Sequence, residues 1–306
     1  MPTVTLRPLS DILVVTLLRP AVIALASFAL PPLDRPLLPT SPGTPPLPTS
    51  LRSHPAPPYA LLWRHAGKSW TRDRSALCLL GVSGWSSRLA LNTWLAAQDT
   101  RHAPVDDTTL RRLWDRMQAR GLVVQSTVTV DPARHHSVAL VWLTAQGRDF
   151  LFELGLPFVA LSEWDRLRLA HNGAAQPVHS AMVIAAAHQF RRRSYTTETC
   201  PPAYAALAPD LLLTDQDGRP VLVEVEVPSH GGQRHRQRLL SKWERQAQTQ
   251  GFVAFCALHP RHRRQLSLLA RQVARQGLAT DLDTLSHAEG TSFPWLETWG
   301  AEAQDG

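Results

Sequence analysis

The fold is decided by residues 209–227, which read PDLLLTDQDGRPVLVEVEV. Two runs of strand-forming residues flank Gln216-Asp217-Gly218, where the glycine suits the left-handed position of a three-residue hairpin loop. Centring this turn on Asp217 places Asp210 directly across from Glu224. The sequence therefore predicts an antiparallel hairpin with one acidic residue on each strand.

The predicted hairpin has one acidic face. Because side chains alternate along a strand, Glu224 and Glu226 share a face, and Asp210 joins it from the partner strand. Like charges opposite each other destabilise a sheet, but a divalent cation between them reverses the sign of the interaction. We therefore predict a metal site at Asp210 and Glu224 for Mg²⁺ or Mn²⁺, which take oxygen ligands and can activate water for phosphodiester hydrolysis. The alternative is an ordinary hairpin with its polar residues in solvent, against which Leu212 and Leu222 on the acidic face argue for burial.

Helices and strands are predicted on both sides of the hairpin. An apolar helix over 178–191 precedes it, and a helix over 233–249, a buried strand over 251–258 and an amphipathic helix over 262–276 follow it. This order predicts an α/β domain with a mixed sheet over residues 176–290.

These residues resemble the PD-(D/E)xK nuclease superfamily, whose core runs helix, hairpin, third strand, helix, strand. Pro209-Asp210 matches its motif literally, and Glu224-Val225-Glu226 stands in place of the (D/E)xK tripeptide. The resemblance implies that Asp210 and Glu224 bind the metal ion. The position of the catalytic lysine is taken by Glu226, which departs from the pattern and puts catalysis in question.

A lysine on the next helix offers a replacement. Lys242 lies in the helix over 233–249, and some members of the superfamily carry their lysine there. Gln246 lies one turn further along the same face. The resemblance thus implies a catalytic set of Asp210, Glu224, Glu226, Lys242 and Gln246. The alternative is that Lys242 is an ordinary solvent-facing helix residue.

The region before this domain resembles a winged helix-turn-helix. Helices are expected over 75–82, 86–97 and from Asp106 to Gly121, followed by strands over 122–130 and 137–143 and a helix over 144–154. The resemblance implies that the third helix and the tip of the two-stranded ribbon contact double-stranded DNA. The residues concerned are Arg111, Arg112, Arg116 and Arg120 on the helix, and Arg134, His135 and His136 at the tip. Winged helices also serve as protein-protein modules, so this alternative stays open.

The charge of the chain is consistent with a polyanionic partner. The formal net charge is +7, and of the 32 basic residues only Lys68 and Lys242 are lysines. Arginine forks match phosphate geometry well, although mutational bias in a GC-rich genome also enriches arginine. Candidates for phosphate contacts beside the acidic site are Arg191, Arg192 and Arg193, with Arg234, Arg236 and Arg238.

The resulting organisation is a mixed α+β and α/β protein. We expect a disordered Pro-rich leader over 1–60, a winged helix-turn-helix over 61–158, a linker over 159–175, the nuclease-like domain over 176–290 and a tail over 291–306. This combination resembles Mrr-type methyl-directed restriction endonucleases and, more closely, replication-relaxation proteins of plasmids and mobile elements, over about residues 70–280. The latter resemblance implies DNA binding in replication or its control.

The first 60 residues allow two interpretations. The apolar run over 12–30 resembles a signal peptide or membrane anchor, but Arg19-Pro20 lies in its middle, where arginine costs about 2.5–3.5 kcal/mol on insertion. We expect a disordered leader, arising from a start codon placed too far upstream, in a cytoplasmic protein without membrane attachment.

Other cofactor sites are not expected. Ala66-Gly67-Lys68-Ser69 lacks the upstream glycine of a phosphate-binding loop, so no nucleotide cofactor is predicted. Cys78 and Cys256 lie in apolar runs and are expected to be core residues.

Three functions remain open. The first is a metal-dependent DNA endonuclease or nicking enzyme, the second a non-cleaving DNA-binding replication or transcription regulator with an inactive nuclease fold, and the third a protein-interaction scaffold. A homodimer is left open.

Overall fold

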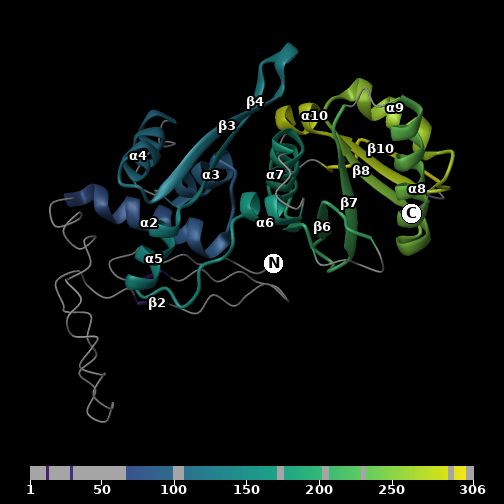
Figure 1. Cartoon of the computed structure of the whole chain (residues 1–306). Coiled ribbons are helices and arrows are strands. Elements are labelled where there is room, and N and C mark those ends of the chain that lie inside the picture. Colours follow the sequence, from purple (N-terminus) through teal and green to yellow (C-terminus); the bar gives the residue numbers. More distant parts are fainter. Residues whose placement is uncertain are drawn as a thin grey trace, which may run out of the picture. The chain divides into compact units, whose positions relative to one another are not determined.

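The computed structural model (Figure 1) describes residues 12–13, 28–29, 67–98, 107–170, 176–201, 207–228, 232–288 and 293–300. The predictions for the leader over 1–60 fall outside these residues, except that β1 (Ile12–Leu13) pairs antiparallel with β2 (Phe28–Ala29). Within the described part of the chain, no helix is both long and apolar enough to cross a membrane.

The chain is a mixed α/β protein that forms two compact units. One unit contains α2 (Gly67–Ser83), α4 (Asp107–Ala119) and α5 (Ala145–Glu153). The other contains α3 (Arg88–Gln98), most of the ribbon of β3 (Val123–Asp131) and β4 (His136–Leu143), and the chain from Leu161 onward. The segment over 61–158 thus contributes to both units.

The first unit is an arrangement of helices around buried apolar side chains. Helix α4 buries the face that its sequence predicts, comprising Leu110, Leu113, Trp114 and Met117. It ends at Ala119, and two residues later Gly121 has a φ of 71°, the left-handed conformation that closes a helix, while Leu122 N donates to Met117 O at 3.0 Å. Both the apolar face and the glycine stop are confirmed.

A six-stranded mixed sheet forms the centre of the second unit. Its strand order is β10-β9-β8-β7-β6-β5, with β7, β8 and β9 parallel to one another and the remaining pairs antiparallel. The strands are β5 (Thr196–Thr199), β6 (Leu211–Thr214), β7 (Pro220–Glu226), β8 (Val253–Ala257), β9 (Gly277–Asp281) and β10 (Glu297–Trp299). The helices of this unit are α3, α6 (Glu163–Ala170), α7 (Pro177–Arg191), α8 (Gly232–Gln250), α9 (Pro260–Ala270) and α10 (Leu282–His287).

Helices cover both faces of this sheet (Figure 1). The apolar helix α7 packs on one face, against Ala254 and Cys256 of β8, and Val130, Val138 and Leu140 of the β3–β4 ribbon belong to the same core. Helices α8 and α9 pack on the other face against Val253 and Phe255 of the same strand. Because successive side chains of β8 point alternately into these two cores, all of them are buried, as the apolar run over 251–258 predicts.

The hairpin has the predicted register. Leu211 pairs with Val223, which puts Asp210 across from Glu224. Gly218 has a φ of 80°, and the Asp215 carboxylate accepts hydrogen bonds from the backbone N–H groups of Asp217 and Arg219. The hydrogen bonds and the glycine of this loop therefore set the register that places Asp210 across from Glu224.

Several elements differ from the expectation. Helix α6 lies inside the segment expected as a linker, and β10 lies inside the expected tail. Helix α9 ends at Ala270, six residues before its apolar pattern stops. Helix α3 begins after Ser87, whose Oγ accepts a hydrogen bond from Ala90 N, and not at Ser86 as expected. Ser86 instead bonds with α6: its N–H donates to the Glu163 carboxylate, and its Oγ accepts from Trp164 N.

Replacing Gly147 by alanine should destabilise the first unit by about 1–3 kcal/mol, since a Cβ would lie 2.0 Å from the backbone oxygen of Leu122. Denaturant unfolding measures this. Ala145→Ser, an exposed change in the same turn, is the control and should stay within about 0.5 kcal/mol. Equal midpoints for the two variants would contradict this packing.

Candidate metal and phosphate site at the end of the sheet

Asp210 lies immediately before β6 and is held in place by two donors. Its Oδ2 accepts a hydrogen bond from Val225 N at 2.8 Å, and His179 Nε2 of α7 lies 3.3 Å from the same oxygen. The residue is 7% exposed. The backbone of β7 therefore fixes the direction of this carboxylate.

Glu224 and Glu226 come from the end of β7 and point to the same face. Both are buried, at 1% and 8% exposure. Two carboxylates at this depth are costly when charged, unless a cation lies beside them.

Lys242 of α8 supplies that positive charge. Its Nζ lies 2.6 Å from Glu224 Oε2, 3.5 Å from Glu226 Oε1 and 4.0 Å from Asp210 Oδ2. One nitrogen atom thus joins all three acids, while about a third of the lysine side chain remains exposed. The structure brings together the four charged residues that the sequence singles out as the catalytic set.

The acids of this cluster differ in protonation. Burial raises the pKa of Glu224 to about 8, although Lys242 counteracts part of this effect, and burial also raises the pKa of Glu226. Burial acts in the same direction on Asp210, but the charge of Lys242 and the hydrogen bond from His179 outweigh it and hold its pKa below the usual range. Asp210 is therefore the permanently charged member of the three.

His179 is a member of the cluster that the sequence does not reveal. Burial disfavours its charged form, but the hydrogen bond to Asp210 and the charge of that carboxylate raise the pKa of the imidazole overall. A single histidine near the start of an apolar helix has no spacing motif, so only the packing of α7 beside the hairpin identifies it.

Gln246 has a different environment from the other predicted residues. It is fully buried, and its Nε2 donates to the backbone oxygens of Leu222 at 2.8 Å and Ala254 at 3.2 Å. These bonds tie α8 to β7 and β8. The described contacts give Gln246 a positioning role, and its part in catalysis stays a prediction.

The cluster opens into a cleft of about 460 Å³. His179, Glu226, Lys242 and His235 are among its lining residues. A small anion or a phosphate group therefore has access to the lysine and to one of the acids.

The donor set fits a hard divalent cation. Glu224 Oε2 and Glu226 Oε1 are buried and face the ammonium group of Lys242, so a metal ion beside Asp210 would take the place of that group at these oxygens. Among the described residues, no group of three or more His, Cys, Asp or Glu side chains is arranged as a ligand cluster. Mg²⁺ is commonly held by one or two carboxylates with water and phosphate, so such a cluster is not needed.

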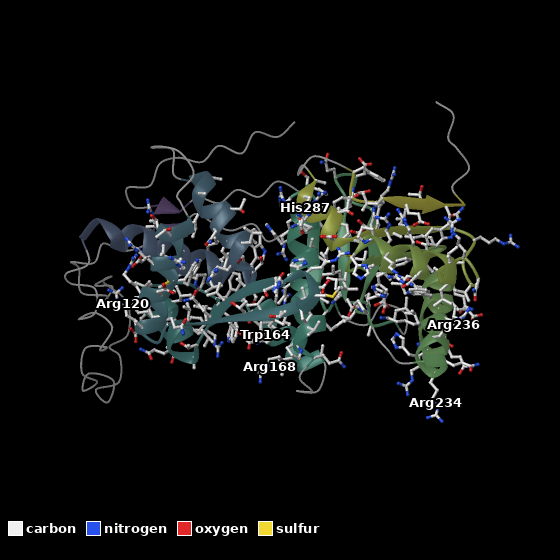
Figure 2. The ribbon with its side chains drawn as sticks, turned by 90° about the horizontal axis from the view of Figure 1, so that it is seen from above. Arg120, Trp164, Arg168, Arg234, Arg236 and His287 are labelled. Carbon is white, nitrogen blue, oxygen red and sulfur yellow. The ribbon has the colours of Figure 1, made fainter. Side chains whose placement is uncertain are left out.

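Several of the predicted DNA-contacting arginines have partners within the chain. Arg116 and Arg120 pair with the buried Asp73 at 2.6 Å and 3.6 Å. Arg191 pairs with the buried Glu163, and Arg192 donates to Gln189. Arg111, Arg112, Arg234 and Arg238 are exposed, and Figure 2 shows Arg234 extending outward from α8.

The tip of the β3–β4 ribbon also makes an ion pair within its own unit. Arg134 Nη1 lies 2.6 Å from Asp283 Oδ2 of α10. Val130, Val138 and Leu140 of the ribbon belong to the core around α7. His135 takes the left-handed conformation at the tip and is exposed, as is Arg134. DNA contact by this tip stays a prediction.

Comparisons with known proteins give no match: no protein-family model, no curated protein and no solved structure is similar to this chain.

Replacing Lys242 by methionine should destabilise the protein by about 3 kcal/mol at pH 8, because three buried acids lose their cation. The loss should be smaller at pH 5. The pKa of Glu224 is raised from 4.5 to about 8 in the folded state, so between these pH values this carboxyl binds more protons in the folded protein than in the unfolded one. At pH 5 the protonated Glu224 therefore no longer repels the neighbouring acids, and the loss of the lysine costs less.

Denaturant unfolding at the two pH values checks this, with Arg245→Met on the exposed side of α8 as the control. A loss independent of pH would contradict the electrostatic role of Lys242.

Proposed function

We propose that this chain is a DNA-binding protein whose second unit is a metal-dependent nuclease-like domain of the PD-(D/E)xK type, hydrolysing phosphodiester bonds. One observation carries the proposal: three buried acids from two neighbouring strands meet a single lysine nitrogen from the following helix, all within 4.0 Å. The order α7, β5–β7, α8, β8 agrees with the core of that superfamily.

Each residue of the cluster has a chemical role in this proposal. Asp210 and Glu224 would hold Mg²⁺ or Mn²⁺ through their oxygens, and His179 and Val225 N keep the Asp210 carboxylate in its orientation. When bound, the ion supplies positive charge to the scissile phosphate and lowers the pKa of a water. Lys242, which reaches the cleft, would then exchange its acidic partners for a phosphate oxygen.

Glu226 takes part differently. Its pKa is raised by burial, and it lines the cleft, so it can accept a proton there. This fits a proton acceptor for the attacking water better than a third permanent charge. The position is the one that a lysine fills in the motif that the sequence resembles.

The elements proposed to form a winged helix-turn-helix are α2, α4 and α5 of the first unit with α3 and the β3–β4 ribbon. Arg111 and Arg112 are its exposed cations on α4, whereas Arg116 and Arg120 are bound to Asp73. We propose that this module brings double-stranded DNA to the nuclease-like domain, in plasmid or mobile-element replication or in DNA processing.

A second candidate is a non-cleaving DNA-binding regulator. The observation that favours it is the position of Lys242, which already neutralises the acids without a metal ion. In that case the cluster stabilises the fold only, and the arginines carry the function.

Cleavage is tested on supercoiled plasmid with Mg²⁺ or Mn²⁺. The wild type should nick the plasmid, and Asp210→Ala should lower the rate by about a hundredfold or more, because the site loses its permanently charged ligand. Asp217→Ala, an exposed acid in the hairpin loop, is the control and should leave the rate unchanged. Absence of nicking by the wild type would favour the regulator, and nicking that persists in Asp210→Ala would remove the site from the mechanism.

Duplex binding is tested by its salt dependence. Replacing both Arg111 and Arg112 by alanine should make the slope of log K against log salt shallower by about 1.8, at about 0.9 per lost phosphate contact. A pair of exposed arginines away from α4, Arg168→Ala with Arg219→Ala, serves as the charge-matched control. Equal slopes for the two double variants would exclude α4 as the DNA-contacting helix.

A further inference from the structure

A second groove runs between α8 and α9 and adjoins the cleft at the acidic site. It encloses about 860 Å³, and Pro228 and His235 line both this groove and the cleft at Lys242. Both helices belong to the same unit. A chain lying in the groove would therefore pass His235 and enter the cleft that Glu226 and Lys242 line.

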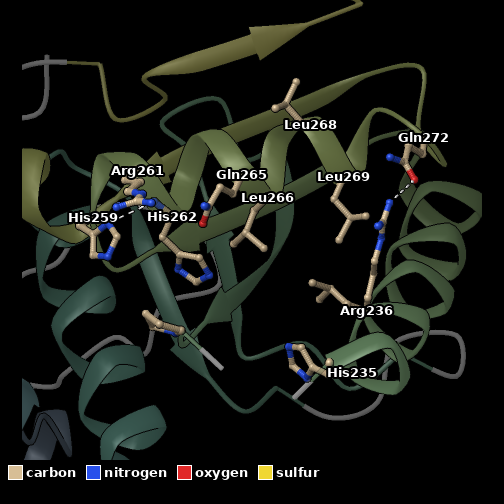
Figure 3. A pocket seen from close by; sticks show the side chains of 13 residues that line it. His235, Arg236, His259, Arg261, His262, Gln265, Leu266, Leu268, Leu269 and Gln272 are labelled. Atoms are coloured by element: carbon tan, nitrogen blue, oxygen red, sulfur yellow. Dashed lines mark hydrogen bonds between the residues drawn. The ribbon is translucent and has the colours of Figure 1, made fainter. Parts of the chain in front are cut away.

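The groove is cationic and has an apolar floor. Arg236 and Arg261 line it, and no carboxylate is among its lining residues. Leu266 and Leu269 form the apolar part, and Figure 3 shows these leucines and His262 pointing from α9 into the groove. Arg236 reaches across from α8 to Gln272 at 3.3 Å.

The imidazole of His262 presents a neutral ring to this space. Burial, together with the nearby His259 and His235, lowers its pKa to about 4. Its backbone N–H donates to His259 Nδ1 at 3.1 Å, which fixes the first turn of α9. A flat, neutral ring beside two leucines is a surface on which a nucleobase can stack.

We propose that this groove binds an unpaired DNA strand, with its phosphates at Arg236 and Arg261 and a base against His262 and Leu269. The inference rests on the proposed function, because it supplies the strand that the acidic site would act on. Cationic groups combined with flat apolar surfaces are the pattern of single-strand binding, since an unpaired base exposes the faces that a duplex hides. A duplex would meet the arginines but would leave the floor of the groove unused.

The test measures binding without cleavage. Fluorescence anisotropy follows the wild-type chain in EDTA with a labelled thymidine oligonucleotide of about 12 nucleotides, and with a duplex of equal length. Arg236→Ala/Arg261→Ala is compared with Arg219→Ala/Arg275→Ala, which removes two exposed arginines outside the groove.

The groove variant should bind the single strand on the order of tenfold more weakly than the control variant. Its slope of log K against log salt should be shallower by about 1.4, at about 0.7 for each of the two lost phosphate contacts. His262→Ala should weaken binding about fivefold for the thymidine strand and leave binding of an abasic strand of the same length unchanged.

Single-strand binding equal to that of the control variant would overturn the inference. An equal loss for the duplex would also overturn it, because the groove would then follow duplex phosphates. Plasmid nicking by the wild type is measured separately with Mg²⁺. If the wild type nicks the plasmid but the groove variant binds the single strand as well as the control does, only the groove inference fails. If single-strand binding depends on the groove but the wild type does not nick the plasmid, only the proposed cleavage fails.

Discussion

Three acidic side chains lie buried at the end of one sheet, and each of them needs a cation beside it in order to be ionised there. Lys242 supplies this cation, with its ammonium group within 4.0 Å of all three acids. The parallel crossover from β7 through α8 to β8 returns the chain over the acidic face, so the lysine comes from the next element in sequence. Removing any one charge alters the cost of burying the others.

Helix α8 is positioned firmly enough for this role. Trp243, the residue after the lysine, stacks on Phe255 of β8, and Gln246 donates to carbonyl groups of both β7 and β8. These contacts fix the helix against the sheet while part of the Lys242 side chain remains accessible. A lysine on a rigid helix with an open cleft beside it can change partners without moving the backbone, which suits a site that would accept a metal ion and a phosphate.

Net charge alone overstates how many arginines a polyanion can reach. Arg116 and Arg191 are bound to the buried acids Asp73 and Glu163, and in these positions they join helices within their own units. Arg134 at the ribbon tip pairs with Asp283. Among the arginines predicted to contact DNA, Arg111 and Arg112 on α4 and Arg234 and Arg238 on the first turns of α8 are exposed, so we expect these to contribute to any long-range attraction of DNA.

Local chemistry determined the hairpin, its register and the opposition of Asp210 and Glu224, because loop residues and side-chain alternation act over a few positions. The same holds for the apolar face of α4 and for its end before Gly121. Only the tertiary structure decided that His179 joins the acids, that Lys242 points toward them, and that a groove runs from His235 between α8 and α9. These contacts join residues far apart in the chain, and they depend on how whole helices pack on the sheet, which no local pattern encodes.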